Sequence, residues 1–225
     1  TLNDNYDVCD EFRELSKTAT NIGPLLLFAK PDVKTRLDIA CGTVRYPEFE
    51  GPAIDCGVLR DAKNDRIYLI PWNNSISKME KGRLTIPKSL LNGRELYNLS
   101  KLEKVTLANG DAFSVDLPPG GGEVFVLTTP AQYAVCENTI RKHQVRQPRL
   151  KANRAFRLAS KWPKIKLNEA KTLLNQAKTA EKAQKWVEAR KIYQNALAAI
   201  EKAQNQDPFY AKCANLIPEI AKNID

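Results

Sequence analysis

The sequence is poor in the side chains that build metal and redox centres. It has one histidine, His143, and five cysteines without a Cys-x-x-Cys pair. A zinc site needs about four converging ligands, so we expect no bound metal and no cofactor. His143 has no serine or cysteine neighbour in a pattern that would make a nucleophilic pair. Acidic pairs such as Asp55 with Asp61 fall at strand and turn positions, which suit a hairpin. The sequence therefore predicts no catalytic residue, and it leaves open whether the chain belongs to an enzyme.

Long apolar runs are also missing. The longest run, residues 22–29, contains Pro24 and is far shorter than the roughly 20 residues needed to cross a bilayer. We therefore expect no membrane span.

Two cysteines, Cys41 and Cys56, fall on neighbouring predicted strands. They could form a disulfide in an oxidising compartment, or remain buried free thiols.

Charge is distributed unevenly along the chain. Residues 1–130 hold 16 Lys and Arg against 18 Asp and Glu, a net charge of −2. Residues 131–225 hold 19 against 8, a net charge of +11. The positive charge of the protein thus belongs to its second part, and the two parts are expected to differ in structure.

The first part has the pattern of an antiparallel β domain. An amphipathic helix is predicted at 7–20, and residues 1–29 form this helix and a connector. Short apolar strands separated by turn residues follow, with no helix between them. This spacing predicts an antiparallel sandwich or barrel, and we expect a β-sandwich over residues 30–130. The clearest element is a hairpin of 54–60 with 66–72, joined by the turn-rich stretch 61–65.

The second part has the pattern of helices. Residues 131–165 are expected to form a basic linker, helical only around Arg149 to Trp162, because Pro148 and Pro163 interrupt it. Residues 166–205 are rich in Ala, Leu, Lys, Glu and Gln and contain no Gly or Pro. This composition predicts two helices, with a short terminal helix at 209–223 completing the region 166–225. The predicted fold class is therefore multi-domain, β then α.

Several stretches carry a family resemblance. They are DCGVLRD at 55–61 followed by RIYLIPWNNS at 66–75, LLNGREL at 90–96, and FSVDLPPGGGEVFVL at 113–127, together with the helix at 7–20 and the GPLL that follows it. In these features residues 30–130 resemble the all-β domain that lies C-terminal to the catalytic barrel in glycoside hydrolases of the β-galactosidase and amylase kind.

The resemblance implies a place in a larger protein. Glycoside hydrolases use paired carboxylates on their barrel strands, and no such strands occur in this sequence. The resemblance thus implies a non-catalytic C-terminal accessory region of a glycoside-hydrolase-like protein. Such a region would support the catalytic barrel or contact carbohydrate. A secreted or cell-envelope location is then favoured over the cytoplasm.

The helical tail resembles a tetratricopeptide hairpin. Trp186, Glu188, Ala189, Tyr193 and Ala196 follow the spacing of the second half of that repeat. Only one repeat is visible, and a three-helix bundle is the alternative fold. The resemblance implies a protein-interaction module acting through the tail, which is the alternative function.

Candidate binding residues fall into two groups. Tyr68, Trp72 and Tyr97, with Asn73 as a polar partner, could stack on and hydrogen-bond to a sugar. The competing interpretation is that these aromatic side chains pack the core or its contact with a catalytic body.

The second group is an interaction surface on the tail, namely Trp186, Tyr193, Arg146, Arg149 and Lys151. The basic stretch 141–166 could contact nucleic acid, with Phe156 and Trp162 as stacking platforms. No nucleic-acid-binding motif is present, so a solvated linker or a patch docking on an acidic protein surface is favoured over nucleic acid.

Overall fold

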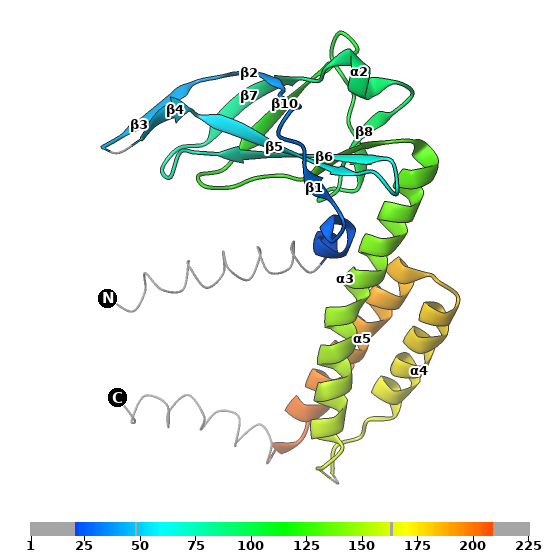
Figure 1. Cartoon of the computed structure of the whole chain (residues 1–225). Helices are drawn as coiled ribbons and strands as arrows, with labels where there is room; N and C mark the ends of the chain where they lie inside the picture. The colour runs from blue at the N-terminus through cyan, green and yellow to red at the C-terminus, as the bar shows by residue number, and fades with distance from the viewer. Residues whose placement is uncertain (1–20, 48, 163, 209–225) are drawn as a thin grey trace. The chain divides into compact units, whose positions relative to one another are not determined.

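The computed structural model describes residues 21–47, 49–162 and 164–208. The chain divides into two compact units, residues 1–140 and 141–225. Antiparallel strands come first and helices follow (Figure 1), which confirms the predicted order of β then α. The helices predicted at 7–20 and 209–223 lie outside the described residues.

A six-stranded antiparallel sheet forms the larger part of the first unit. Its longest pair is the predicted hairpin, which is confirmed by a continuous register from Ile54 opposite Asn73 to Asp61 opposite Arg66. The turn closes with Asp65 in the left-handed region, at φ 49°, and Asn64 donates a hydrogen bond to Asp61. In spatial order the strands are β1 (Lys30–Pro31), β5 (Ile54–Asp61), β6 (Arg66–Asn73), β11 (Phe125–Thr128), β8 (Glu95–Asn98) and β9 (Glu103–Lys104).

Two smaller sheets complete the strands of the unit. One has three strands in the order β10 (Ala112–Leu117), β7 (Glu80–Thr85) and β2 (Asp38–Cys41), and the short helix α2 (Lys88–Leu91) follows β7. The other is a hairpin of β3 (Thr43–Tyr46) and β4 (Phe49–Pro52), which the sequence pattern did not predict.

One apolar core joins the six-stranded and three-stranded sheets. Strand β10 shows why: Phe113, Val115 and Leu117 are buried, while Ser114 and Asp116 between them are exposed. Successive side chains of a strand point to opposite faces, so this alternation places one face inside. The buried residues of β10 and β7 form a single cluster with those of β5, β6, β8 and β11. Each fully buried aliphatic side chain contributes about 1.5–3 kcal/mol.

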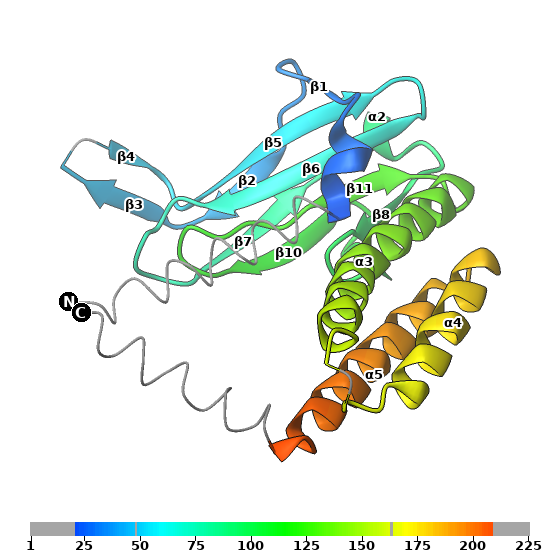
Figure 2. The ribbon, with the colours of Figure 1, turned by 90° about the horizontal axis from the view of Figure 1, so that it is seen from below.

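Helical segments cover part of the other face of the six-stranded sheet. Residues 21–26 are helical, and Ile22 and Leu25 pack with Tyr68 and Tyr97 of the sheet. The first turns of α3 (Pro130–Ala159) add further contacts to the same cluster (Figure 2). Tyrosines at these positions are therefore enclosed by segments from both ends of the unit's sequence.

The second unit consists of helices. After the boundary at residue 141, α3 continues and is followed by α4 (Asn168–Lys182) and α5 (Trp186–Asn205). The connection 183–185 is short, and α4 and α5 pack side by side (Figure 1). Small side chains allow this close approach. Their shared cluster contains Val145, Ala152, Leu174, Ala177, Ala180, Ala189, Tyr193 and Ala196.

Helix α3 differs from the partly helical linker expected over 131–165. It runs without interruption from Pro130 and contains Pro148. A proline inside a helix removes one backbone hydrogen bond and costs about 3 kcal/mol in isolation. The buried residues Val145, Ala152 and Ala159 recur every seven residues and therefore lie on one side of α3. Their packing against other apolar residues of the unit offsets the cost of the proline.

Among the described helices, none is both long and apolar enough to span a membrane.

Cys41, Cys56 and Cys136 are free thiols, so the disulfide considered between Cys41 and Cys56 is not formed. Burial raises the pKa of the Cys56 thiol to about 12.

Candidate functional site

Trp72 is the most exposed aromatic side chain on the six-stranded sheet. It lies on β6, on the face opposite the shared core, and is 38% exposed. A Cβ built on Gly57 of the neighbouring strand would meet Trp72 Cζ3 at 3.4 Å. The indole ring therefore lies over a position that carries no side chain, in van der Waals contact with the sheet.

Polar groups fix this ring at its edge. The indole Nε1 donates a hydrogen bond of 2.9 Å to Asn74 Oδ1. Asn74 is itself held, because its Nδ2 donates to the Pro52 carbonyl at 3.0 Å. Asp55 stands directly opposite Trp72 on β5 and is exposed. We call Asp55, Gly57, Trp72 and Asn74 the Trp72 surface.

A glycine-rich loop borders the same end of β6. Residues 118–122 form a tight turn, with Gly120 at φ 61°. The backbone N–H of Asn73 donates to the Gly121 carbonyl at 2.8 Å, and the backbone N–H of Gly120 donates to the Ser75 carbonyl at 2.8 Å. The loop amides are thus used within the sheet and hold the chain around the Trp72 surface.

The other predicted sugar-binding residues do not join Trp72. Tyr68 is fully buried and donates a hydrogen bond of 3.0 Å to the Leu25 carbonyl. Tyr97 is only 5% exposed, and its ring stacks on Tyr133 with centroids 3.8 Å apart. Neither ring presents a free face, so the core-packing interpretation describes both tyrosines.

Burial also changes the chemistry of these tyrosines. It raises the pKa of Tyr68 to about 12, because the phenolate would lose its hydration. The pKa of Tyr97 is raised by burial first and then by its hydrogen bond to Glu95. Both groups are neutral hydrogen-bond donors across the physiological range.

Asn73 is a structural residue. Its Nδ2 lies within 2.8–3.0 Å of the carbonyls of Lys78, Leu117 and Pro118, and its Oδ1 accepts from the Ser75 amide at 2.7 Å. The side chain is 3% exposed. It therefore ties the end of β6 to the loop after β10 and cannot reach a ligand.

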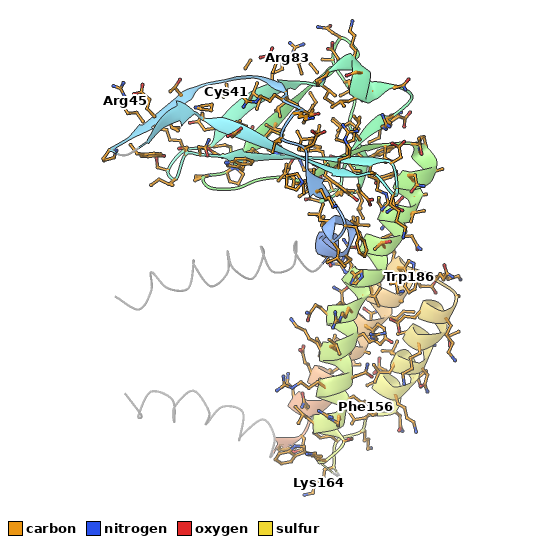
Figure 3. All side chains as sticks on the ribbon, in the orientation of Figure 1. Cys41, Arg45, Arg83, Phe156, Lys164 and Trp186 are labelled. Carbon is orange, nitrogen blue, oxygen red and sulfur yellow. The ribbon has the colours of Figure 1, made fainter. Side chains whose placement is uncertain are left out.

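The predicted interaction residues of the tail also separate into buried and exposed groups. Tyr193 is fully buried, and Trp186, at the start of α5 (Figure 3), is half-buried against the helical core. Arg149 forms an ion pair with Glu181 at 3.2 Å. Arg146 and Lys151 are exposed on α3. The structure thus leaves three of the five, namely Arg146, Arg149 and Lys151, on an accessible surface.

Gly57 is the member of the site that sequence reasoning missed. A glycine inside a strand weakens it and often marks a place where another group approaches closely. In β5 that group is the indole of Trp72. The pattern IDCGVLRD carries this signal, but it does not identify the approaching side chain.

The described residues contain no group of three or more His, Cys, Asp or Glu side chains placed to hold a metal. The pKa of His143 is lowered by burial and then by the positive charges of Arg146 and Lys142.

The Trp72 surface offers binding chemistry. It presents an aromatic face for the apolar side of a ligand ring, with amide and carboxylate groups at its edge.

Comparisons with models of protein families, with curated proteins and with solved structures found no match.

Proposed function

We propose that this chain is a non-catalytic accessory region of a glycoside-hydrolase-like protein, and that its first unit contacts carbohydrate through the Trp72 surface. The observation that carries the proposal is the indole in contact with the strand at Gly57, with more than a third of Trp72 exposed and its Nε1 fixed by Asn74. A pre-oriented aromatic face loses little conformational entropy when a ligand ring stacks on it.

The finer fold that we propose fits this role. The six-stranded and three-stranded sheets would form an antiparallel β-sandwich around their shared core, as in the β domains that follow hydrolase barrels. The helices after residue 141 would form a tetratricopeptide-like hairpin or a three-helix bundle, with alanines at the helix crossings.

Glycan binding by matched tryptophan variants tests the proposal. Trp72→Ala is compared with Trp162→Ala, because both side chains are 38% exposed and only Trp72 lies on the sheet. Binding to a panel of insoluble and soluble polysaccharides is measured by pull-down and affinity electrophoresis. We expect Trp72→Ala to lose binding and Trp162→Ala to retain it, with similar unfolding midpoints for the two variants.

Three results would contradict the proposal. The first is retention of glycan binding by Trp72→Ala. The second is turnover of glycosidase substrates by the purified chain, which would show that it is catalytic. The third is failure of the wild-type chain to bind any polysaccharide of the panel, which would contradict the carbohydrate role.

A protein-interaction role of the tail is the second candidate. Leu150 and Leu158 are 51% and 48% exposed, and they lie eight residues apart on α3 with Arg154 between them. Residues at i, i+4 and i+8 share one side of a helix, so an apolar and basic stripe faces outward. Co-purification with the parent protein's other domains that is lost in Leu150→Ser/Leu158→Ser, and retained in Trp72→Ala, would favour this role.

A further inference from the structure

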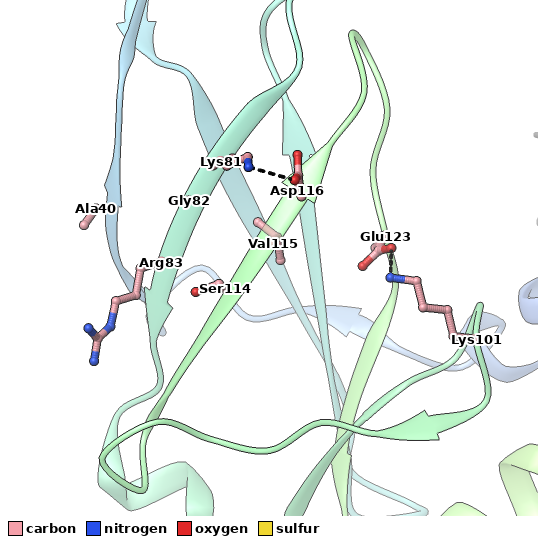
Figure 4. Close-up of a pocket in the computed structure, with 9 residues that line it drawn as sticks. All are labelled: Ala40, Lys81, Gly82, Arg83, Lys101, Ser114, Val115, Asp116 and Glu123. Atoms are coloured by element: carbon pink, nitrogen blue, oxygen red, sulfur yellow. Dashed lines mark ion pairs between the residues drawn. The ribbon is translucent and has the colours of Figure 1, made fainter.

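A polar pocket of about 590 Å³ lies at the three-stranded sheet (Figure 4). Its floor comes from adjacent strands, since Ala40 of β2 and Ser114 of β10 both stand opposite Arg83 of β7. Two flanking residues, Lys101 and Glu123, come from the loops beside β8 and β11. The remaining lining residues are Lys81, Gly82, Val115 and Asp116.

Both acidic side chains of the pocket are already neutralised. Lys81 Nζ lies 3.4 Å from Asp116, and Lys101 Nζ lies 2.9 Å from Glu123. The second pair is reflected in the pKa of Lys101, which is raised chiefly by its hydrogen bond to Glu123. The pocket therefore keeps one positive charge in excess, that of Arg83.

The guanidinium of Arg83 is open to a ligand. No hydrogen bond or ion pair engages it within residues 21–47, 49–162 and 164–208, and the side chain is exposed. Its cross-strand neighbours are an alanine and a serine, which are too short to cover it. Figure 4 shows Arg83 extending away from Asp116 and Glu123.

We propose that this pocket binds an acidic sugar, with the planar fork of Arg83 receiving the anionic group and Ser114 serving as a hydroxyl partner. An arginine matches a carboxylate with two parallel hydrogen bonds, which gives geometric selectivity as well as affinity. The polar side chains around it suit the hydroxyl groups of the same ligand. The inference rests on the proposed carbohydrate role and adds a second, chemically distinct contact on the same unit.

Oligosaccharides that differ only in their acidic group test this pocket. Binding of uronic-acid, sulfated and neutral oligosaccharides of similar length is measured by titration calorimetry and by chemical-shift perturbation. The variants are Arg83→Gln, Arg83→Lys and, as a control with the same charge change, Arg45→Gln. Arg45 lies on β3, is 76% exposed and pairs with Glu50 outside the pocket.

We expect Arg83→Gln to weaken uronate binding by about tenfold or more, Arg83→Lys to weaken it less, and Arg45→Gln to leave it unchanged. Selective binding of sulfated oligosaccharides with the same dependence on Arg83 would identify a sulfate as the anionic group. Equal binding of acidic and neutral oligosaccharides, or uronate binding that survives Arg83→Gln, would overturn the proposal.

Trp72→Ala separates this inference from the proposed function. Loss of neutral-glycan binding in Trp72→Ala, with no acidic sugar bound at Arg83, would overturn the pocket alone. Acidic-sugar binding that depends on Arg83 and is untouched by Trp72→Ala, with no neutral glycan bound, would support the pocket and contradict the role of the Trp72 surface. All variants alter exposed side chains, so their unfolding midpoints should match that of the wild type and exclude misfolding as a cause.

Discussion

The hydroxyl of Tyr193 donates a hydrogen bond of 3.0 Å to Oε2 of Glu181, whose other carboxylate oxygen accepts from Arg149. These three side chains lie on α5, α4 and α3, so one carboxylate connects the three helices that the structure describes in the second unit. Burial raises the pKa of Tyr193 first, and the carboxylate raises it further. The phenol therefore stays protonated and serves as a permanent donor.

Removing the hydroxyl and removing the ring of Tyr193 should have different costs. We expect Tyr193→Phe to destabilise the second unit by about 1–2 kcal/mol, because a charged acceptor loses its donor. Tyr193→Ala should cost roughly 3–5 kcal/mol, because it also leaves a cavity among small alanines. Urea unfolding followed by circular dichroism measures both. Equal losses for the two variants would contradict this division.

Asn73 offers a sharper test of polar packing at the end of β6. Asn73→Ala leaves three carbonyls without their shared donor, and we expect a loss of about 2–3 kcal/mol. Asn73→Asp should destabilise the first unit more than this, because a carboxylate would face the same carbonyls. Asn74→Asp is the matched control at a half-exposed neighbour. If Asn73→Asp were as mild as Asn74→Asp, the carbonyl contacts would not govern stability.

Local patterns were sufficient to predict part of this fold. The β5–β6 hairpin was predicted from apolar runs around a turn-rich stretch, and both signals lie within twenty consecutive residues, 54–73. Strand β10 follows the same logic, since its alternation of Phe113, Val115 and Leu117 with polar residues is visible in the sequence. Turn chemistry and periodicity act locally, so a single sequence contains them.

Long-range contacts account for what could not be predicted. The burial of Tyr68 depends on Leu25 and on α3, which lie more than forty residues away on either side. Helix α3 passes through Pro148 because distant apolar residues hold its buried side. Of the candidate sugar-binding residues only Trp72 reaches the surface, and its ring position depends on Gly57 of another strand.

Alkaline pH should weaken the first unit through Tyr68. Its folded-state pKa is raised to about 12, whereas a tyrosine in the unfolded chain titrates near 10. Above that value the unfolded state releases its proton first, so stability is complete below pH ~10 and is lost as the pH rises toward 12. The loss should approach about 1.4 kcal/mol per pH unit for this group.

Urea unfolding at a series of alkaline pH values measures this slope. Tyr68→Phe removes the titrating hydroxyl, so the variant should be less stable near neutral pH and should show a shallower alkaline decline. Tyr97, whose pKa is also raised by burial, continues to contribute in the variant. An unchanged alkaline slope in Tyr68→Phe would contradict the assignment.

The contact between Trp72 and Gly57 gives a test of binding that leaves the tryptophan in place. A Cβ at residue 57 would lie 3.4 Å from Trp72 Cζ3, so the methyl group of Gly57→Ala would touch the ring without displacing it, whereas a larger side chain would collide with the ring and push it away from the sheet. We expect Gly57→Ala to keep most glycan binding and Gly57→Val to lose it, with tryptophan fluorescence reporting the change in ring exposure. Gly23 has nothing within 4 Å of a built Cβ, so Gly23→Ala serves as the control. If Gly57→Val bound glycans as the wild type does, the contact of the indole with Gly57 would have no part in recognition, and the carbohydrate role of the Trp72 surface would lose the observation on which it depends.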